Sequence, residues 1–153
     1  MEATGLSPLS RKIYDPIRKK WVEALPEEIV RQKILSHLVN DLGYPPQSIA
    51  IEKSLLELLH TSNEAVPNRR IDILCFETKT LQPLLLIECK AVRLEEKMLS
   101  QIMGYNAHIG APLICLANEG EFLLRWKGEP LFEIENHLPS YAMLKSYNGQ
   151  FTY

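Results

Sequence analysis

The sequence predicts an α/β fold in which a mixed central β-sheet lies between helices. The chain of 153 residues suits one compact domain, and 46% of it is hydrophobic, which is enough to bury a core. Segments with helical spacing of apolar residues alternate with apolar, β-branched segments that are typical of strands. One of these strands, residues 84–90, opens with four consecutive apolar residues, which indicates a central strand covered by helices on both faces.

The first helix is predicted over residues 27–41. Pro26 stands where the first turn of a helix tolerates proline, and Glu27 and Glu28 follow where the helix dipole favours carboxylates. Apolar residues then recur at helical spacing until Gly43 and two prolines end the pattern. Residues 1–20 are polar and basic, and we treat them as a lead-in to a single domain that spans residues 21–153.

The central sheet is predicted from the segments that follow. Residues 49–51 and 70–76 have strand composition, and a polar loop at residues 61–68 lies between them. Residues 55–59 are short and almost wholly apolar, so they fit a strand or a helix, and we favour a strand. A turn at residues 78–83 makes the strand at 84–90 antiparallel to the one at 70–76.

A second helix and a second hairpin complete the predicted fold. Residues 94–108 place Leu94, Met98, Ile102 and Tyr105 on one helical face. Residues 112–117 and 121–126 are apolar runs whose short polar connection is typical of a β-hairpin. After residue 128 the pattern is weaker.

Composition and charge exclude several classes of protein. A formal net charge of -2 excludes a globally basic nucleic-acid coat, though not a local basic patch. No run approaches the roughly 20 apolar residues of a membrane helix, so we expect a soluble, cytoplasmic protein with no membrane partner. Cys75, Cys89 and Cys115 each lie in an apolar stretch, which indicates reduced core thiols. No glycine opens a phosphate loop, which excludes a P-loop ATPase.

Three polar side chains should meet at one end of the hairpin of residues 70–90. Alternation along the strand puts Glu88 and Lys90 on one face, and the antiparallel turn brings Asp72 to the same end. Two carboxylates suit Mg²⁺, and a neighbouring lysine can orient an attacking water and stabilise developing charge. The alternative is a solvated salt bridge at the end of a hairpin, and spacing alone does not exclude it.

Six short segments resemble one known family. In order they are Asp15-Pro-Ile-Arg-Lys-Lys-Trp21, Pro26-Glu-Glu-Ile-Val-Arg-Gln32, Leu42-Gly-Tyr-Pro45, Arg70-Ile-Asp72, Glu88-Cys-Lys90 and Gln101-x-x-x-Tyr105-Asn106. Asp72 with Glu88-Cys-Lys90 resembles the D...E-x-K signature of PD-(D/E)xK nucleases. The whole set, over roughly residues 12–126, resembles the N-terminal domain of type I restriction enzyme R subunits. The E-x-K element alone is a weak signal, but the order of the six segments is specific.

This resemblance implies a restriction-endonuclease-like core and a metal-dependent nuclease that hydrolyses DNA phosphodiester bonds. Asp72 and Glu88 would bind Mg²⁺, for which Mn²⁺ could substitute, and Lys90 would serve the attacking water. Gln101 and Tyr105 would complete the site from the second helix, although without the resemblance we would assign Tyr105 to the core and Gln101 to the solvated surface.

The resemblance also implies a supporting acid from the first helix, for which Glu27 and Glu28 are the candidates. At about 100° per residue, Glu27 falls in line with Ile34 and Leu38, whereas Glu28 falls to the side of this stripe. A metal ligand should lie at the flank of the buried stripe, where water and substrate can enter. We therefore choose Glu28 as the third metal ligand, while Glu27 remains an alternative.

DNA is the expected partner, and cations near the site are the candidate phosphate contacts. Arg69 and Arg70 precede the Asp72 strand, and further cations lie before the first helix. For Arg70, a salt bridge to Glu52 or to another acid at the end of the sheet is an equally good interpretation. Type I R subunits carry an ATP-driven motor after this domain, and because the sequence has no phosphate loop we expect a nuclease-type domain that lacks the motor. A separate motor or specificity protein is then a further candidate partner, and a non-catalytic DNA-binding or partner-docking module is the alternative function.

Overall fold

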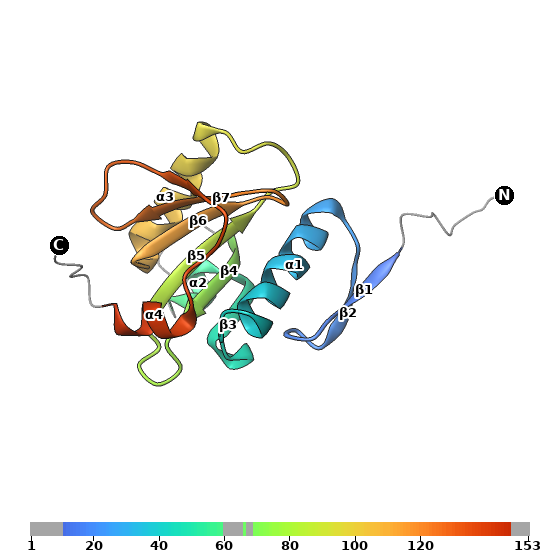
Figure 1. Cartoon of the computed structure of the whole chain (residues 1–153). Helices are drawn as coiled ribbons and strands as arrows, with labels where there is room; N and C mark the ends of the chain where they lie inside the picture. Colours follow the sequence, from blue (N-terminus) through green and yellow to red (C-terminus); the bar gives the residue numbers. More distant parts are fainter. Residues whose placement is uncertain (1–10, 60–65, 67–68, 148–153) are drawn as a thin grey trace.

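The computed structural model describes residues 11–59, 66 and 69–147. Six strands form a mixed sheet in the order β3-β4-β5-β6-β7-β8, and β1 and β2 form a separate hairpin. Helices cover both faces of the sheet (Figure 1). In chain order the elements are β1 (Lys12–Asp15), β2 (Lys20–Glu23), α1 (Pro26–Asn40), a 3-10 helix (Pro46–Ser48), β3 (Ile49–Ser54), α2 (Leu55–Leu58), β4 (Arg70–Phe76), β5 (Pro83–Cys89), α3 (Glu96–Ile109), β6 (Leu113–Ala117), β7 (Phe122–Trp126), β8 (Glu133–Glu135) and α4 (Tyr141–Ser146). The predicted α/β class with a mixed central sheet flanked by helices is confirmed.

The central position of β5 follows from its apolar run Leu84-Leu85-Leu86-Ile87. β5 pairs antiparallel with β4 and parallel with β6, and its residues Leu85, Leu86 and Ile87 are fully buried. Alternate residues of the sheet contribute to two cores, one beneath α1 and α4 and the other beneath α2 and α3. The prediction that the first helix covers one face of the hairpin of residues 70–90 is therefore confirmed.

Helix α1 begins and ends as the sequence predicts. Pro26 occupies the first turn with Glu27 and Glu28, and the chain leaves the helix at Asp41 before Gly43, whose φ of 77° is easily adopted by glycine. The second predicted helix is α3, and the predicted hairpin of residues 112–126 is β6 and β7. The three cysteines are buried and free, as expected.

The prediction of a strand at residues 55–59 was wrong, because this segment begins with helix α2. The Ser54 side chain accepts the backbone N–H of Glu57, and the Glu57 side chain accepts the N–H of Ser54. This reciprocal capping box stabilises a helical turn that the apolar pattern alone does not reveal. The predicted loop at residues 61–68 lies outside the described residues except for Val66.

The two ends of the described chain hold elements that the sequence patterns did not reveal. Residues 12–23, partly within the predicted basic lead-in, form the β1–β2 hairpin. Strand β8 pairs with β7, and α4 begins at Ser140, whose side chain accepts the backbone N–H of Met143. No helix among the described residues has the length and apolar character needed to cross a membrane.

Candidate functional site

Asp72, Glu88 and Lys90 lie together at one end of the β4–β5 pair. Asp72 and Glu88 each adjoin the paired residues Ile73 and Ile87, so the two acids face each other across the two strands. The Lys90 Nζ lies 3.8 Å from Glu88 Oε2, and Asp72 Oδ2 accepts the backbone N–H of Cys89 at 2.7 Å. The structure therefore brings together the three residues of the predicted signature.

The surroundings of the Glu88 carboxyl group raise its pKa. Glu88 is only 7% exposed, and this burial, with the charge of Asp72 as the next cause, raises its pKa to about 7. The charge of Lys90 and a hydrogen bond from the backbone N–H of Asp72 act in the opposite direction. A buried acid beside a second acid indicates a site where a further cation would be stabilising.

The substitution Glu88→Gln should stabilise the metal-free protein by about 2–3 kcal/mol near pH 8. Because the folded-state pKa lies above the ordinary value, the stability contributed by protonated Glu88 is complete below pH of about 4.5 and is lost as the pH rises through about 7. Glutamine keeps the neutral form at every pH. Urea unfolding in a chelating buffer measures the effect, and Glu133→Gln, at an exposed acid, is the matched control. An equal gain near pH 5 and pH 8 would contradict the assignment.

Helix α3 brings Tyr105 near the carboxylates of Glu88 and Asp72, and Gln101 lies next to Tyr105. Tyr105 is 7% exposed, and burial, followed by the charge of Glu88, raises the pKa of its hydroxyl. The charge of Arg69 and the nearby Gln101 side chain act in the opposite direction on this pKa. Tyr105 thus belongs to the core and to the surroundings of the site at once, while Gln101 is exposed at its edge.

Arg31 is the cation at the centre of the site, and sequence reasoning missed it. It is 5% exposed and donates from Nη1 to Glu28 Oε1 at 2.7 Å and from Nη2 to Asp72 Oδ1 at 3.0 Å. Its Nη1 also lies 3.0 Å from Glu52 Oε1. One buried guanidinium therefore joins three carboxylates from α1, β3 and β4, and it fixes the orientation of Asp72.

The two acids of the first helical turn differ from the expectation in burial. Glu28 is buried and binds Arg31 as well as Arg18, whose Nη2 lies 2.8 Å from Glu28 Oε2. Glu27 is exposed, and its charge contributes to the raised pKa of Glu88, after burial and Asp72. The geometric reason for choosing Glu28 was therefore wrong, since Glu27 is the acid on the open side of the helix.

Metal-ligating side chains are few at this site. Among the described residues, no group of three or more His, Cys, Asp or Glu side chains is arranged to hold a metal ion. Asp72 and Glu88 are the pair with the right chemistry, because Mg²⁺ takes few protein ligands and keeps water in its other positions.

The predicted phosphate contacts Arg69 and Arg70 are both exposed at the start of β4. Arg70 Nη1 donates to the backbone carbonyl of Glu52 at 2.6 Å, and the carboxylate of Glu52 binds Arg31 and lies 3.6 Å from Arg18. The structure thus shows a contact from Arg70 to the backbone of Glu52 in place of the expected salt bridge to its carboxylate.

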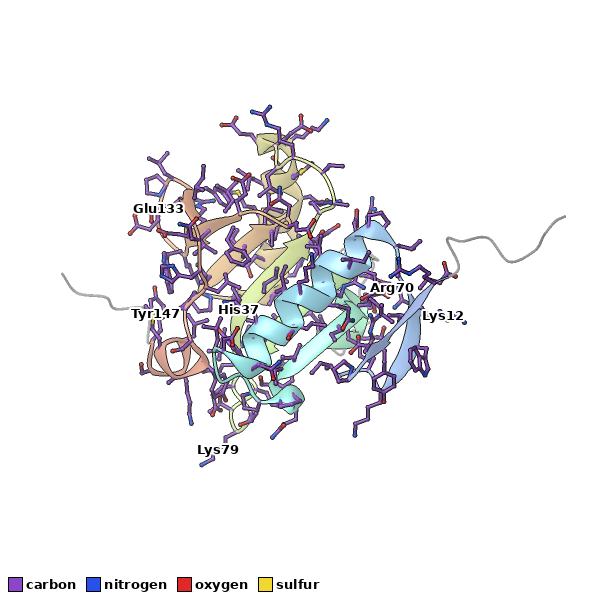
Figure 2. All side chains as sticks on the ribbon, turned by 45° about the vertical axis from the view of Figure 1, so that its right-hand side comes forward. Lys12, His37, Arg70, Lys79, Glu133 and Tyr147 are labelled. Carbon is purple, nitrogen blue, oxygen red and sulfur yellow. The ribbon has the colours of Figure 1, made fainter. Side chains whose placement is uncertain are left out.

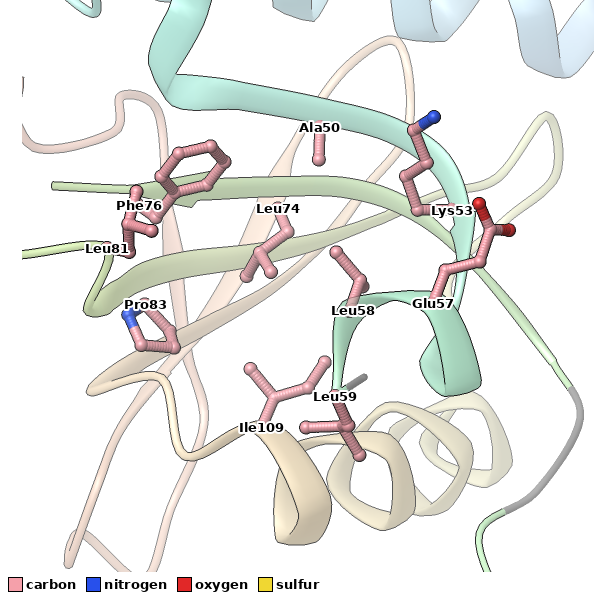
Figure 3. Close-up of a pocket in the computed structure, with 10 residues that line it drawn as sticks. All are labelled: Ala50, Lys53, Glu57, Leu58, Leu59, Leu74, Phe76, Leu81, Pro83 and Ile109. Atoms are coloured by element: carbon pink, nitrogen blue, oxygen red, sulfur yellow. The ribbon is translucent and has the colours of Figure 1, made fainter. Parts of the chain in front are cut away.

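An apolar pocket of about 510 Å³ lies apart from these residues, between α2, the C-terminal end of α3 and strands β3, β4 and β5 (Figure 3). Leu58, Leu74 and Phe76 line it, and its charged residues are Lys53 and Glu57. None of the predicted site residues lines this pocket. The acidic site is therefore at the strand ends rather than in an apolar cavity.

Comparison with models of known protein families matches residues 26–139 to the family described as type I restriction enzyme R protein N terminus. The chain belongs to this family. Comparison with curated proteins and with solved structures gave no match. The match to the type I restriction enzyme R protein N terminus spans α1 to the segment before α4 and so includes the acidic site. The β1–β2 hairpin lies outside it.

Proposed function

We propose that the chain is a Mg²⁺-dependent nuclease that hydrolyses DNA phosphodiester bonds as part of restriction. The observation that carries the proposal is the convergence of Asp72, Glu88 and Lys90 at the end of the β4–β5 pair. Tyr105 from α3 lies near them with Gln101 next to it, in the order along the chain that the resemblance to type I R subunits implies. Membership of a restriction-enzyme family supports DNA as the substrate.

Asp72 and Glu88 would hold the metal, and an acid of the first helical turn would assist them. A buried carboxyl group beside a second carboxylate is a donor set that suits a hard divalent cation, and Mn²⁺ has similar preferences. When bound, the cation would supply stabilisation of the negative charge that develops on the phosphate. Glu27 is the better-placed assistant because it is exposed and its charge acts on Glu88, whereas Glu28 is buried between Arg18 and Arg31.

The remaining residues would bind and orient the reactants. Lys90 lies close enough to Glu88 to orient a water against the phosphate and to balance charge in the transition state. Arg31 holds Asp72 in one orientation through Oδ1, and the backbone N–H of Cys89 holds its other oxygen. Arg69 and Arg70, exposed two or three residues before Asp72, would contact the DNA backbone.

A non-catalytic DNA-binding or partner-docking module is the second candidate function. The observation that favours it is the ion network of Arg31, which already pairs with Asp72, Glu28 and Glu52 without a metal. In that case the family context suggests docking to a separate motor or specificity protein, with the acids as structural ion-pair partners.

Metal binding and DNA cleavage measured on the same preparations test the proposal. Calorimetric titration with Mg²⁺ or Mn²⁺ should show binding to the wild-type protein and none to Asp72→Asn. Supercoiled, linear and single-stranded DNA should then be cut by the wild-type protein only when metal is present. DNA binding without cleavage of any of these substrates would support the second function.

A further inference from the structure

The outer face of the β1–β2 hairpin presents two exposed aromatic rings. Tyr14 pairs with Trp21 across the strands, and their ring centroids lie 5.4 Å apart with an interplanar angle of 67°. Tyr14 is 48% exposed and Trp21 is 65% exposed. Leaving rings of this size in water forgoes the stabilisation that burial would give, so paired exposed aromatics indicate a binding surface.

Positive charge surrounds this aromatic pair in a protein whose net charge is -2. Within residues 11–23 five cations stand against two acids, and one of these acids, Asp15, is fully buried. The exposed cations of the hairpin are Arg11, Lys12, Lys19 and Lys20, and its exposed acid is Glu23, which lies across from Lys12. The accessible surface of the hairpin therefore complements a polyanion.

A polar groove of about 480 Å³ connects the hairpin turn with β3 and β4. Its cationic lining residues are Arg18, Lys20, Lys53 and Arg70, and its acids are Glu52 and Glu57. Lys12 and Arg70 lie toward the same side of the molecule, whereas Lys79 lies at the end of the β4–β5 turn (Figure 2). Because Arg70 precedes Asp72 by two residues on β4, the groove leads from the hairpin toward the acidic site.

The hairpin is held in a fixed position relative to that site. The buried Asp15 carboxylate accepts the backbone N–H groups of Ile17 and Arg18 at 2.7 and 2.9 Å and the Gln32 side chain of α1 at 3.0 Å. Burial opposes ionisation of Asp15, but these hydrogen bonds and those of the Arg18 side chain lower its pKa overall. Arg18 in turn binds Glu28, which binds Arg31. A ligand on the hairpin would thus be held in register with Asp72.

We propose that the β1–β2 hairpin binds a single-stranded segment of nucleic acid, with bases stacked on Tyr14 and Trp21 and a phosphate against Lys12, which lies on the same face of the hairpin. Unpaired bases fit this surface because their faces are free to stack, whereas a duplex hides the faces of its bases. Lys20 lies on the opposite face of the hairpin and lines the groove with Lys53 and Arg70, so a longer strand would pass round the edge of the hairpin to reach this groove. One part of the inference rests on the proposed function, namely that the bound strand is the substrate of the site at Asp72.

Binding of a fluorescein-labelled oligothymidylate in a chelating buffer, where cleavage is blocked, tests the stacking surface. Trp21→Ala should weaken binding by about ten-fold or more, as expected for loss of a stacked base, and Trp21→Phe should restore most of the affinity. Leu131→Ala is the matched control, because Leu131 is an apolar side chain that is 74% exposed outside the hairpin and the groove. A duplex of the same length should bind more weakly than the single strand.

The salt dependence of the same binding tests the phosphate contacts. Lys12→Gln should reduce the slope of log affinity against log salt by about 0.7, the value for one phosphate contact on a single strand. Lys79→Gln, at an exposed lysine of the β4–β5 turn, should leave the slope unchanged. Equal slopes for wild-type protein and Lys12→Gln would remove Lys12 from the contact surface.

The outcomes separate this inference from the proposed nuclease function. Binding that depends on Trp21 in a protein that cuts no DNA supports the hairpin surface and contradicts the nuclease. Cleavage of single-stranded DNA with the same KM in wild-type protein and Trp21→Ala supports the nuclease and overturns the hairpin surface. Three other results also overturn the hairpin surface: an unchanged affinity of Trp21→Ala for oligothymidylate, a duplex that binds as tightly and with the same dependence on Trp21, and no binding of any oligonucleotide. The last of these results would leave a protein partner as the occupant of the hairpin.

Discussion

Replacing Lys90 with alanine should lower the rate of DNA cleavage by about two or more orders of magnitude while Mg²⁺ stays bound. A protonated lysine coordinates no metal, so its removal separates catalysis from metal binding. The Lys90 Nζ lies 3.8 Å from Glu88 Oε2, and 20% of the side chain is exposed, so it borders both the acids and the solvent from which water and substrate enter.

The metal titration of Lys90→Ala must be made where Glu88 is ionised. Burial and the charge of Asp72 raise the pKa of Glu88 and Lys90 lowers it, so the variant should need a higher pH than the wild-type protein to bind metal equally well. Asp72→Ala should instead lose metal and cleavage together, and Lys79→Ala, at an exposed lysine, should change neither. Wild-type protein that cuts no faster than Lys90→Ala, with contaminating nuclease excluded, would show that these residues form no active site.

The parts of the fold that depend on long apolar patterns could be predicted from the sequence. The run Leu84-Leu85-Leu86-Ile87 predicts a central strand because it can be buried on both faces, and β5 is central. Short elements could not be predicted in this way. A four-residue helix such as α2 depends on the Ser54–Glu57 capping box, and the β1–β2 hairpin is partly exposed and so lacks an apolar repeat.

The candidate site was predictable where it depends on strand geometry and unpredictable where it depends on contacts between elements. Alternation and an antiparallel turn are enough to bring together Asp72, Glu88 and Lys90. The ion pair of Arg31 with Asp72 joins residues 41 positions apart, which no local pattern specifies. A signal was nevertheless present, because Arg31 precedes Ile34 and Leu35 by three and four residues and so lies on the buried face of α1. A charge on a buried helical face requires a partner.

The substitution Arg31→Ala should reduce the free energy of unfolding by about 3–5 kcal/mol near neutral pH, which is the usual cost of leaving buried charges without their partner. Without the guanidinium, Glu28 and Asp72 would remain close together at low exposure with no cation between them. Urea unfolding measures the loss. Lys33→Ala is the matched control on the same helix, because Lys33 and Glu119 form an ion pair whose side chains are 60% and 65% exposed, and such pairs contribute about 1 kcal/mol or less.

Two further measurements on Arg31→Ala distinguish electrostatic repulsion from lost packing. Acid should reduce the deficit, because protonated carboxyl groups no longer repel each other, whereas a packing defect would be the same at every pH. Mg²⁺ should raise the unfolding temperature of Arg31→Ala more than that of the wild-type protein if Asp72 is a metal ligand, since a bound cation stabilises only the folded state and would replace the lost positive charge. A deficit independent of pH together with no response to Mg²⁺ would mean that Arg31 serves packing alone and that Asp72 binds no metal.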